Sequence, residues 1–251
     1  MTKAPTETGM NRTGIKLSPI DSKAMIEGAE GAAVTTGDAE QIEELRREVS
    51  ENAPPRGSMP PPATIKGAVK TAVDMLKGDR PTVFIDLLGE RLAFERGGVR
   101  LYQALMVKFE AADVHEGGPT RAALERIARE ELEHVALLVR AFDSLGADAT
   151  AMTPSADVVA VVSQGLFQLL TDPRTTLTEG LRGILIAELA DNDGWRTLAR
   201  LAREMNHTDL AVEFETALIE EDDHLERVRA WLNASIFEQA GAEPPPIQPA
   251  H

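Results

Sequence analysis

Residues 124–138 read LERIAREELEHVALL, and residues 214–231 read FETALIEEDDHLERVRAW. In both stretches apolar residues recur every three or four positions, which is the spacing of one face of an α-helix. A Glu-x-x-His pair replaces two apolar residues in the middle of each face: Glu131 with His134, and Glu221 with His224. Residues three apart share a helix face, so we expect both pairs to point into the core of a helical protein.

Two further segments show the same kind of apolar face and also interrupt it with a carboxylate. The predicted helix at about 81–112 places Glu95 on its face, with Tyr102 seven residues later and therefore on the same side. The predicted helix at about 175–205 places Glu188 and Asp191 on its face. The segments 120–145 and 209–238 carry the two Glu-x-x-His pairs, so each of the four helices contributes a carboxylate to the predicted core.

Four carboxylates in an apolar core are unfavourable unless their charge is compensated, because burial and like charges both oppose ionisation. Two divalent cations would balance four negative charges, and two neutral imidazoles would complete the ligand set. The sequence therefore predicts a dinuclear metal centre. The alternative is that these are ordinary solvated glutamates. The predicted ligands are Glu95, Glu131, His134, Glu188, Glu221 and His224.

A third Glu-x-x-His pair, Glu204 and His207, lies at the end of the segment 175–205. The apolar face of that segment continues through Leu198 and Ala202, and the pair does not fall on it. We therefore expect Glu204 and His207 to lie at the surface and to take no part in the metal centre.

The composition excludes several classes of protein. A formal net charge of −15 argues against binding to nucleic acids or anionic membranes, which are themselves polyanions. The absence of cysteine removes disulfides, thiolate catalysis and iron–sulfur ligation. No apolar run is long enough to span a membrane or to resemble a signal peptide, so we expect a cytoplasmic protein.

Outside the helices that carry the motifs, the chain changes character. Residues 1–62 contain no aromatic residue and seven of the fifteen prolines, so we expect them to be mostly disordered, with a short polar helix at 39–51. Residues 63–80 include a short amphipathic helix, predicted over 64–77, which we expect to pack on the main domain or on a neighbouring subunit. The tail 241–251 is proline-rich and is expected to be loose.

Residues 81–240 are predicted to form one all-α domain, a four-helix bundle. The apolar segment 155–170, SADVVAVVSQGLFQLL, lies between the second and third helices of the bundle. We expect it to form an extra helix within a long crossover connection.

The arrangement of the motifs resembles the ferritin-like di-iron and di-manganese carboxylate proteins, over about residues 81–238. In that superfamily two helices supply one Glu each, and the other two supply a Glu-x-x-His pair each. The interval from Glu95 to Tyr102 and the 33-residue interval from Glu188 to Glu221 are similar to those of bacterioferritins and rubrerythrins. The lack of cysteine means that the rubredoxin module typical of rubrerythrins is missing.

The resemblance implies a role for each candidate residue. Asp191 lies where rubrerythrins carry an additional carboxylate. Because its side chain is shorter, Asp191 is interpreted as a partner for a histidine N–H, with direct binding to a metal as the alternative. Tyr102 is either a redox neighbour of the metals or a buried hydroxyl that bonds a ligand carboxylate. Glu131 and Glu221 would bridge the two metals, Glu95 and Glu188 would bind one metal each, and His134 and His224 would complete the site.

The resemblance also implies a function, namely a redox reaction with dioxygen or peroxide at two iron ions, or at two manganese ions or a mixed pair. Manganese catalase-like enzymes, ferroxidase or iron-storage subunits and oxygenases are alternatives, as is a structural bundle stabilised by its metals. Assembly into a homo-oligomer is also expected. Gly97 and Gly98, just after Glu95, would leave room for a bulge, for a small-molecule path or for close helix packing.

Overall fold

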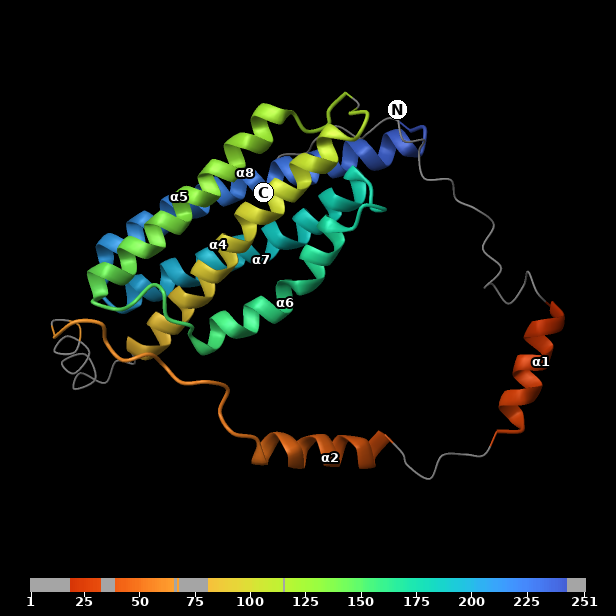
Figure 1. The fold of residues 1–251 in the computed structure, drawn as a ribbon, viewed down its shortest axis with the longest axis horizontal. Coiled ribbons are helices and arrows are strands. Elements are labelled where there is room, and N and C mark those ends of the chain that lie inside the picture. The colour runs from red at the N-terminus through yellow and green to blue at the C-terminus, as the bar shows by residue number, and fades with distance from the viewer. Residues whose placement is uncertain (1–18, 33–38, 66, 68–80, 115, 243–251) are drawn as a thin grey trace. The chain divides into compact units, whose positions relative to one another are not determined.

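The computed structural model describes residues 19–32, 39–65, 67, 81–114 and 116–242. These residues belong to two compact units, which divide between Arg56 and Gly57. The helices α1 (Pro19–Glu30) and α2 (Ala39–Asn52) belong to the first unit. The second unit contains the helices that carry the motifs, and it is shown in the upper part of Figure 1.

The second unit is a bundle of long helices: α4 (Pro81–Glu110), α5 (Arg121–Leu145), α7 (Leu177–Glu204) and α8 (Thr208–Gln239). Helix α4 packs against α5 and α7, and α7 packs along α8, while α5 and α8 touch only sparsely. Helix α6 (Pro154–Thr171) lies along α4 within the long connection from α5 to α7 (Figure 1). Every regular element in the described residues is a helix, which confirms the predicted all-α, ferritin-like bundle with a crossover helix.

Side chains just before each helix fix where three of these helices begin. Thr120, Thr153 and Thr176 each accept a hydrogen bond from a backbone N–H in the first turn of α5, α6 and α7. At α7 the side chain of Glu179 bonds back to the N–H of Thr176, which completes a capping box. Such a cap stabilises a helix by about 1 kcal/mol, and it also sets which residues face inward.

The core of the bundle has two apolar clusters. One cluster is built around Trp195, Phe142 and Phe214, and the other around Leu105, Ile127 and Ile184. In each of α4, α5, α7 and α8 the buried carboxylates and histidines fall at the level where one cluster gives way to the other. The bundle therefore encloses a polar layer between two apolar layers.

The N-terminal region differs in part from the expectation. Helix α2 matches the polar helix predicted at 39–51, but α1 was not expected within a segment predicted to be mostly disordered. The apolar side chains of α2, which are Ile42, Leu45 and Val49, are exposed. The amphipathic helix predicted over 64–77 and the tail from 243 onward lie largely outside the described residues, so those interpretations stay predictions.

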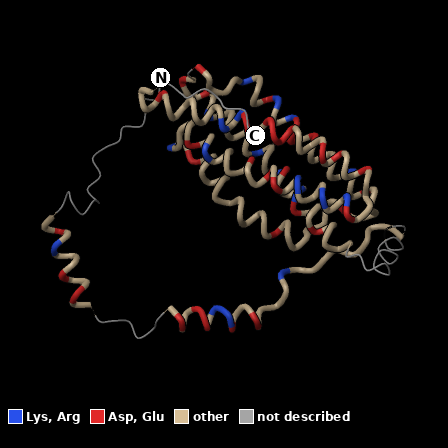
Figure 2. Tube along the Cα trace, turned by 180° about the vertical axis from the view of Figure 1, so that it is seen from behind, with Lys and Arg blue, Asp and Glu red and all other residues tan. Residues whose placement is uncertain are grey.

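Two properties of the described helices bear on what the chain can bind. None of them is both long and apolar enough to cross a membrane. Acidic residues are distributed along the bundle helices with basic residues between them (Figure 2).

Candidate metal centre

The six residues predicted as metal ligands lie together in the polar layer, and each is at most 2% exposed. Their oxygen and nitrogen atoms form overlapping groups in which all atoms lie within 4.8 Å of one another. We call the group of Glu131, Glu188, Glu221 and His224 the Glu188 position, and the group of Glu95, His134 and Glu221 the Glu95 position. Glu221 belongs to both groups, and a third group joins Glu95, Glu131, Asp191 and Glu221.

Both histidines turn the same ring nitrogen toward the carboxylates. Nδ1 of His134 lies 2.8 Å from Oε1 of Glu221 and 3.5 Å from Oε2 of Glu95. Nδ1 of His224 lies 3.3 Å from Oε2 of Glu221, and the two ring centroids are 6.2 Å apart. Glu221 therefore lies between two imidazoles that face it from α5 and α8.

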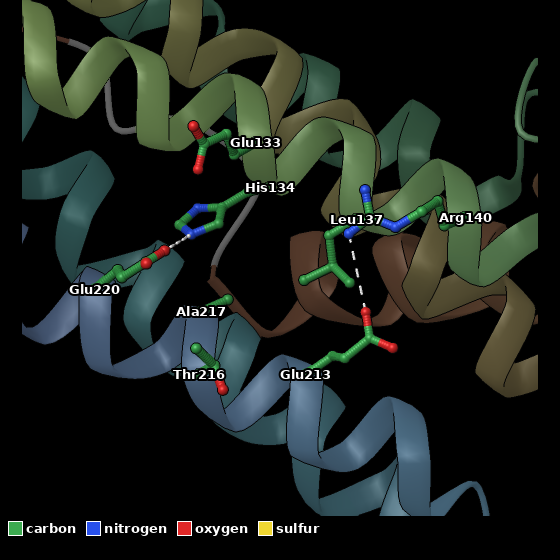
Figure 3. A pocket seen from close by; sticks show the side chains of 8 residues that line it. All are labelled: Glu133, His134, Leu137, Arg140, Glu213, Thr216, Ala217 and Glu220. Atoms are coloured by element: carbon green, nitrogen blue, oxygen red, sulfur yellow. Dashed lines mark hydrogen bonds and ion pairs between the residues drawn. The ribbon is translucent and has the colours of Figure 1, made fainter.

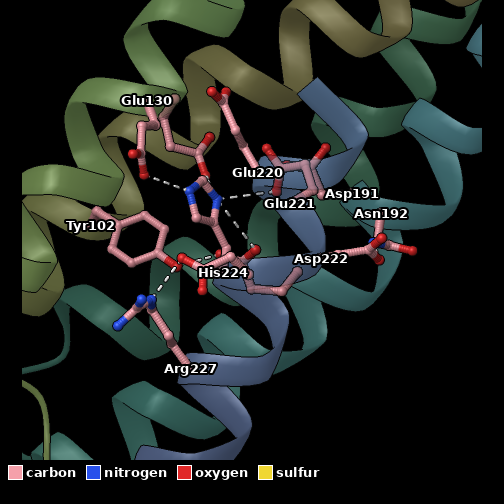
Figure 4. A network of polar contacts seen from close by, with 12 residues as sticks. Tyr102, Glu130, Asp191, Asn192, Glu220, Glu221, Asp222, His224 and Arg227 are labelled. Atoms are coloured by element: carbon pink, nitrogen blue, oxygen red, sulfur yellow. Dashed lines mark hydrogen bonds and ion pairs between the residues drawn. The ribbon is translucent and has the colours of Figure 1, made fainter. Parts of the chain in front are cut away.

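The outer nitrogens of the two histidines contact a second pair of glutamates. Nε2 of His134 lies 2.8 Å from Oε2 of Glu220, and Nε2 of His224 lies 2.9 Å from Oε2 of Glu130 (Figures 3 and 4). Each contact crosses between α5 and α8. A carboxylate at this position keeps the proton on Nε2, orients the ring and leaves Nδ1 available to a metal.

The sequence analysis missed Glu130 and Glu220, although a signal for them was present. Each stands directly before the glutamate of a Glu-x-x-His pair, so the repeated pattern is Glu-Glu-x-x-His at 130–134 and at 220–224. Adjacent helical residues point about 100° apart, so one glutamate of each pair enters the core and the other stays near its edge. Glu220 is 41% exposed, whereas Glu221 is fully buried.

Tyr102 and Trp195 each hold one oxygen of a candidate terminal ligand. The hydroxyl of Tyr102 donates a hydrogen bond to Oε1 of Glu188, in line with its interpretation as a buried hydroxyl on a ligand carboxylate. The indole N–H of Trp195 donates to Oε1 of Glu95 at 2.7 Å, a contact that the sequence analysis did not predict. The Oε2 atoms of Glu95 and Glu188 have no hydrogen-bond partner. Each of these carboxylates is thus held by one oxygen and free at the other.

The structure pairs Asp191 with a residue other than the expected histidine. Asp191 forms a buried ion pair with Arg91 instead, with 2.6 Å between its Oδ1 and Nη1 of the arginine. The glutamates Glu130 and Glu220 take the histidine N–H groups. Sequence reasoning missed Arg91, which stands four residues before Glu95 and therefore on the same face of α4.

The remaining prominent motif stays outside the centre, as predicted. Glu204 is exposed, and the ring of His207 stacks on Phe84 with 5.0 Å between the ring centroids. Among the described residues, no group of potential ligands includes either of them.

Buried atoms without partners show that the residues fit metal ions. An unsatisfied buried polar atom typically costs about 1–3 kcal/mol, so several in one place call for a shared partner. Divalent cations would be such a partner for atoms that converge within a few ångströms. Atoms of the six residues that lack a hydrogen bond are Glu95 Oε2, Glu131 Oε2, His134 Nδ1, Glu188 Oε2 and Glu221 Oε1.

Gly98 makes room for one of these atoms. A Cβ atom on Gly98 would lie 2.2 Å from Oε2 of Glu131, far inside contact distance. A Cβ atom on the neighbouring Gly97 would contact only the ring of Phe167 on α6, at 3.4 Å. Close approach of the Glu131 side chain to α4 therefore accounts for Gly98, whereas a side chain at position 97 would make only an ordinary van der Waals contact.

The charge balance without metal shows in the pKa values of the carboxylates. Burial and the nearby charge of Glu221 raise the pKa of Glu188 to about 8, and the same two causes raise that of Glu131 well above its usual range. Burial also raises the pKa of Glu221, but the close contact with His134 and the hydrogen bond with His224 outweigh burial and lower the pKa to about 2.

The pKa values of the two histidines are raised, whereas burial alone would lower them. Burial lowers the pKa of His134, but the close contacts of its ring with the carboxylates of Glu221 and Glu95 outweigh this effect and raise the pKa to about 11. The pKa of His224 rises to about 9, since its hydrogen bond to Glu221 again outweighs burial. Protons therefore balance the charge in the metal-free protein, and cations entering the centre must displace them.

Four helices that enclose a layer of carboxylates and histidines define a ferritin-like carboxylate bundle. The chain belongs to the rubrerythrin family, whose sequence model matches residues 86–232. No curated protein and no solved structure matches the chain significantly.

The histidines provide the first test of the centre. Replacing His134 or His224 by alanine should lower metal affinity at least about 10–100-fold, because loss of a ligand should cost no less than loss of its supporting contacts. His207→Ala should leave affinity unchanged. Metal titration of the purified variants measures this, and equal losses for all three would contradict the assignment.

Gly98 provides a second test with a neighbouring control. Gly98→Ala should displace the carboxylate of Glu131 and weaken metal binding, whereas Gly97→Ala should not. Both changes raise helix propensity by about 1 kcal/mol, so a difference between them reports the local clash. Metal affinity and thermal unfolding of both variants would be compared, and equal affinities would show that Glu131 does not need the space.

The pH dependence follows from the raised pKa values. The pKa of Glu188 is about 8 in the folded protein, against an ordinary value of 4.5. The folded state therefore binds the proton more tightly than the unfolded state, and this stabilises the fold fully below about pH 4.5. The stabilisation is lost as the pH rises through 8. His134 and His224 act in the same direction at higher pH. The metal-free protein should therefore melt at lower temperature at pH 9 than at pH 6, and added Mn²⁺ should stabilise it more at pH 9. A metal-free melting temperature that rises over this range would contradict these shifts.

Proposed function

We propose that the protein is a di-iron oxidoreductase that reacts with dioxygen or hydrogen peroxide. The observation that carries this proposal is the pair of overlapping ligand groups, the Glu95 position and the Glu188 position, with Glu221 common to both. Four carboxylates and two imidazoles form a hard, oxygen-rich ligand set, which suits iron or manganese better than copper or zinc. Membership of the rubrerythrin family supports the same assignment.

In this proposal the ligands keep the roles that the resemblance implies. Glu131 and Glu221 would bridge the two metals. Glu95 and His134 would complete the Glu95 position, and Glu188 and His224 would complete the Glu188 position. The charges support this arrangement. Arg91 neutralises Asp191, and the negative charges of the four ligand carboxylates would balance the positive charges of two divalent cations.

The surrounding residues would hold the ligands in place and keep water out. Glu130 and Glu220 fix the histidine rings, and Tyr102 and Trp195 fix one oxygen each of Glu188 and Glu95. The two apolar clusters close the layer from both ends of the bundle. When bound, two iron ions would supply one electron each to a small oxidant.

The size of a pocket beside His134 supports a small substrate. A hollow of about 220 Å³ lies between α5 and α8, and His134 and Glu220 form part of its wall (Figure 3). Most of the other lining side chains are polar or charged, including Glu133, Arg140 and Glu213. Organic substrates usually occupy larger and more apolar cavities of about 300–1,000 Å³. The volume of this hollow lies below that range, which supports dioxygen or peroxide over the organic substrate of an oxygenase.

A manganese catalase-like activity is the second candidate, because the same hard ligand set suits a manganese pair equally well. The two candidates differ in what happens to peroxide. A di-iron peroxidase consumes peroxide together with electrons from a donor. A catalase converts peroxide to water and dioxygen with no donor.

The experiment begins with metal analysis of freshly purified protein, where about two iron or manganese ions per chain are expected. Protein loaded anaerobically with Fe²⁺ is then mixed with hydrogen peroxide, and iron oxidation is followed by absorbance. Oxidation of about two Fe²⁺ per peroxide would support the proposal, since peroxide takes up two electrons. Dioxygen release by the manganese-loaded protein would support the second candidate instead.

A pair of variants ties the result to the site. Glu221→Gln should abolish both metal binding and peroxide turnover, because Glu221 belongs to both ligand groups. Glu226→Gln, an exposed position on the same helix, should change neither. Wild-type protein that binds no iron or manganese would refute the proposed function.

A further inference from the structure

A buried ion pair between Arg91 and Asp191 borders the ligand groups. Arg91 lies on α4 one turn before Glu95, and Asp191 lies on α7 one turn after Glu188. Nη1 of Arg91 is 2.6 Å from Oδ1 of Asp191, and it also donates a hydrogen bond to the backbone carbonyl of Asp191 at 2.8 Å. Both side chains are 3% exposed, so water competes little for either charge.

Asp191 lies close enough to the centre to bind a metal itself. Its carboxylate belongs to a group with Glu95, Glu131 and Glu221 whose atoms all lie within 4.8 Å of one another. That group contains no histidine. The ligands around Glu95 can therefore be assembled in two ways, with His134 or with Asp191, and both sets use Glu95 and Glu221.

The fold holds Arg91 in the place where it engages Asp191. A Cβ atom on Gly194 would lie 2.1 Å from Nη1 of Arg91, so the absence of a side chain there creates the space. The guanidinium carbon lies 4.5 Å from the ring centroid of Phe94, within the range of a cation–π contact. Nε lies 3.7 Å from Oε1 of Glu95. A guanidinium stays charged at any physiological pH, so its hold on a neighbouring carboxylate is permanent.

We propose that Arg91 withholds Asp191 from the metal at the Glu95 position, so that His134 is the ligand there. Arg91 is thus a positioning residue that selects between the two ligand sets. This inference rests on the proposed two-metal centre and adds which residues occupy one of its positions. Without Arg91 the layer would carry a fifth uncompensated carboxylate, and a divalent cation would be its nearest positive partner.

The test asks whether loss of Arg91 lets Asp191 replace His134. Metal-free protein is titrated with Co²⁺, whose visible absorption reports the number and kind of ligands. Wild-type protein should bind about two ions. His134→Ala should lower the affinity for one of the two ions at least about 10–100-fold. Arg91→Met in the His134→Ala background should restore binding of that second ion. Its absorption band should differ from that of the wild-type protein, because a carboxylate has replaced the nitrogen ligand.

Two control variants assign the rescue to the released carboxylate. Adding Asp191→Asn to the Arg91→Met and His134→Ala variant should abolish the second ion again. Arg91→Lys, which keeps the positive charge, should give no rescue. Failure of Arg91→Met to rescue, with wild-type binding intact, would overturn this inference alone, whereas wild-type protein without bound metal would overturn the proposed function.

Asp191→Asn as a single variant keeps the inference testable if the Arg91→Met variants do not fold. Asparagine can still accept a hydrogen bond from Arg91, so the pocket around the guanidinium is preserved. Both Co²⁺ ions and the absorption spectrum should be unchanged, because Asp191 is not a ligand while Arg91 is present. Loss of one ion in this variant would show that Asp191 already binds metal, and would overturn the inference.

Discussion

The structure depends on one electrostatic constraint: four glutamates lie in a water-poor layer between two apolar clusters. Ionised carboxylates in such a place are costly unless positive charge or hydrogen bonds compensate them. The pKa values of Glu131 and Glu188 show this cost, because burial drives both upward. Glu221 escapes it only because two histidines face it. Metal ions would compensate all four groups at once.

Most of the polar contacts around the layer hold the candidate metal ligands in position. Tyr102 and Trp195 each hold one oxygen of a glutamate and leave the other oxygen open. Glu130 and Glu220 fix the histidine rings so that Nδ1 points inward. Gly98 and Gly194 supply space, the first for Glu131 and the second for Arg91. Supporting contacts of this kind are expected to influence metal affinity about as strongly as some ligands do.

Sequence reasoning could predict whatever depends on position within one helix. The spacing of Glu131 and His134 placed both on one face of α5, and the same rule placed Glu95, Glu188 and Glu221, all of which the structure brings together. The approximate helical boundaries followed from apolar periodicity. These features are local, so a single sequence contains them.

What the sequence could not predict depends on how two helices are rotated against each other. The packing of α4 on α7 decides whether Asp191 contacts a histidine or Arg91. The approach of α5 to α8 decides that Glu130 pairs with His224. Composition also gives no signal for α1, which lies in a segment poor in large apolar residues. Contacts between helices depend on how the helices are placed, which the spacing within one helix does not specify.

The most direct test of the account is a crystal structure of the protein loaded with Fe²⁺ or Mn²⁺, with anomalous scattering recorded at the edge of the metal. A dinuclear centre should give two peaks about 3.5–4 Å apart inside the polar layer. Glu131 and Glu221 should contact both peaks, and Asp191 should contact neither because it remains paired with Arg91. A single peak, or peaks confined to the surface of the bundle, would contradict the dinuclear centre.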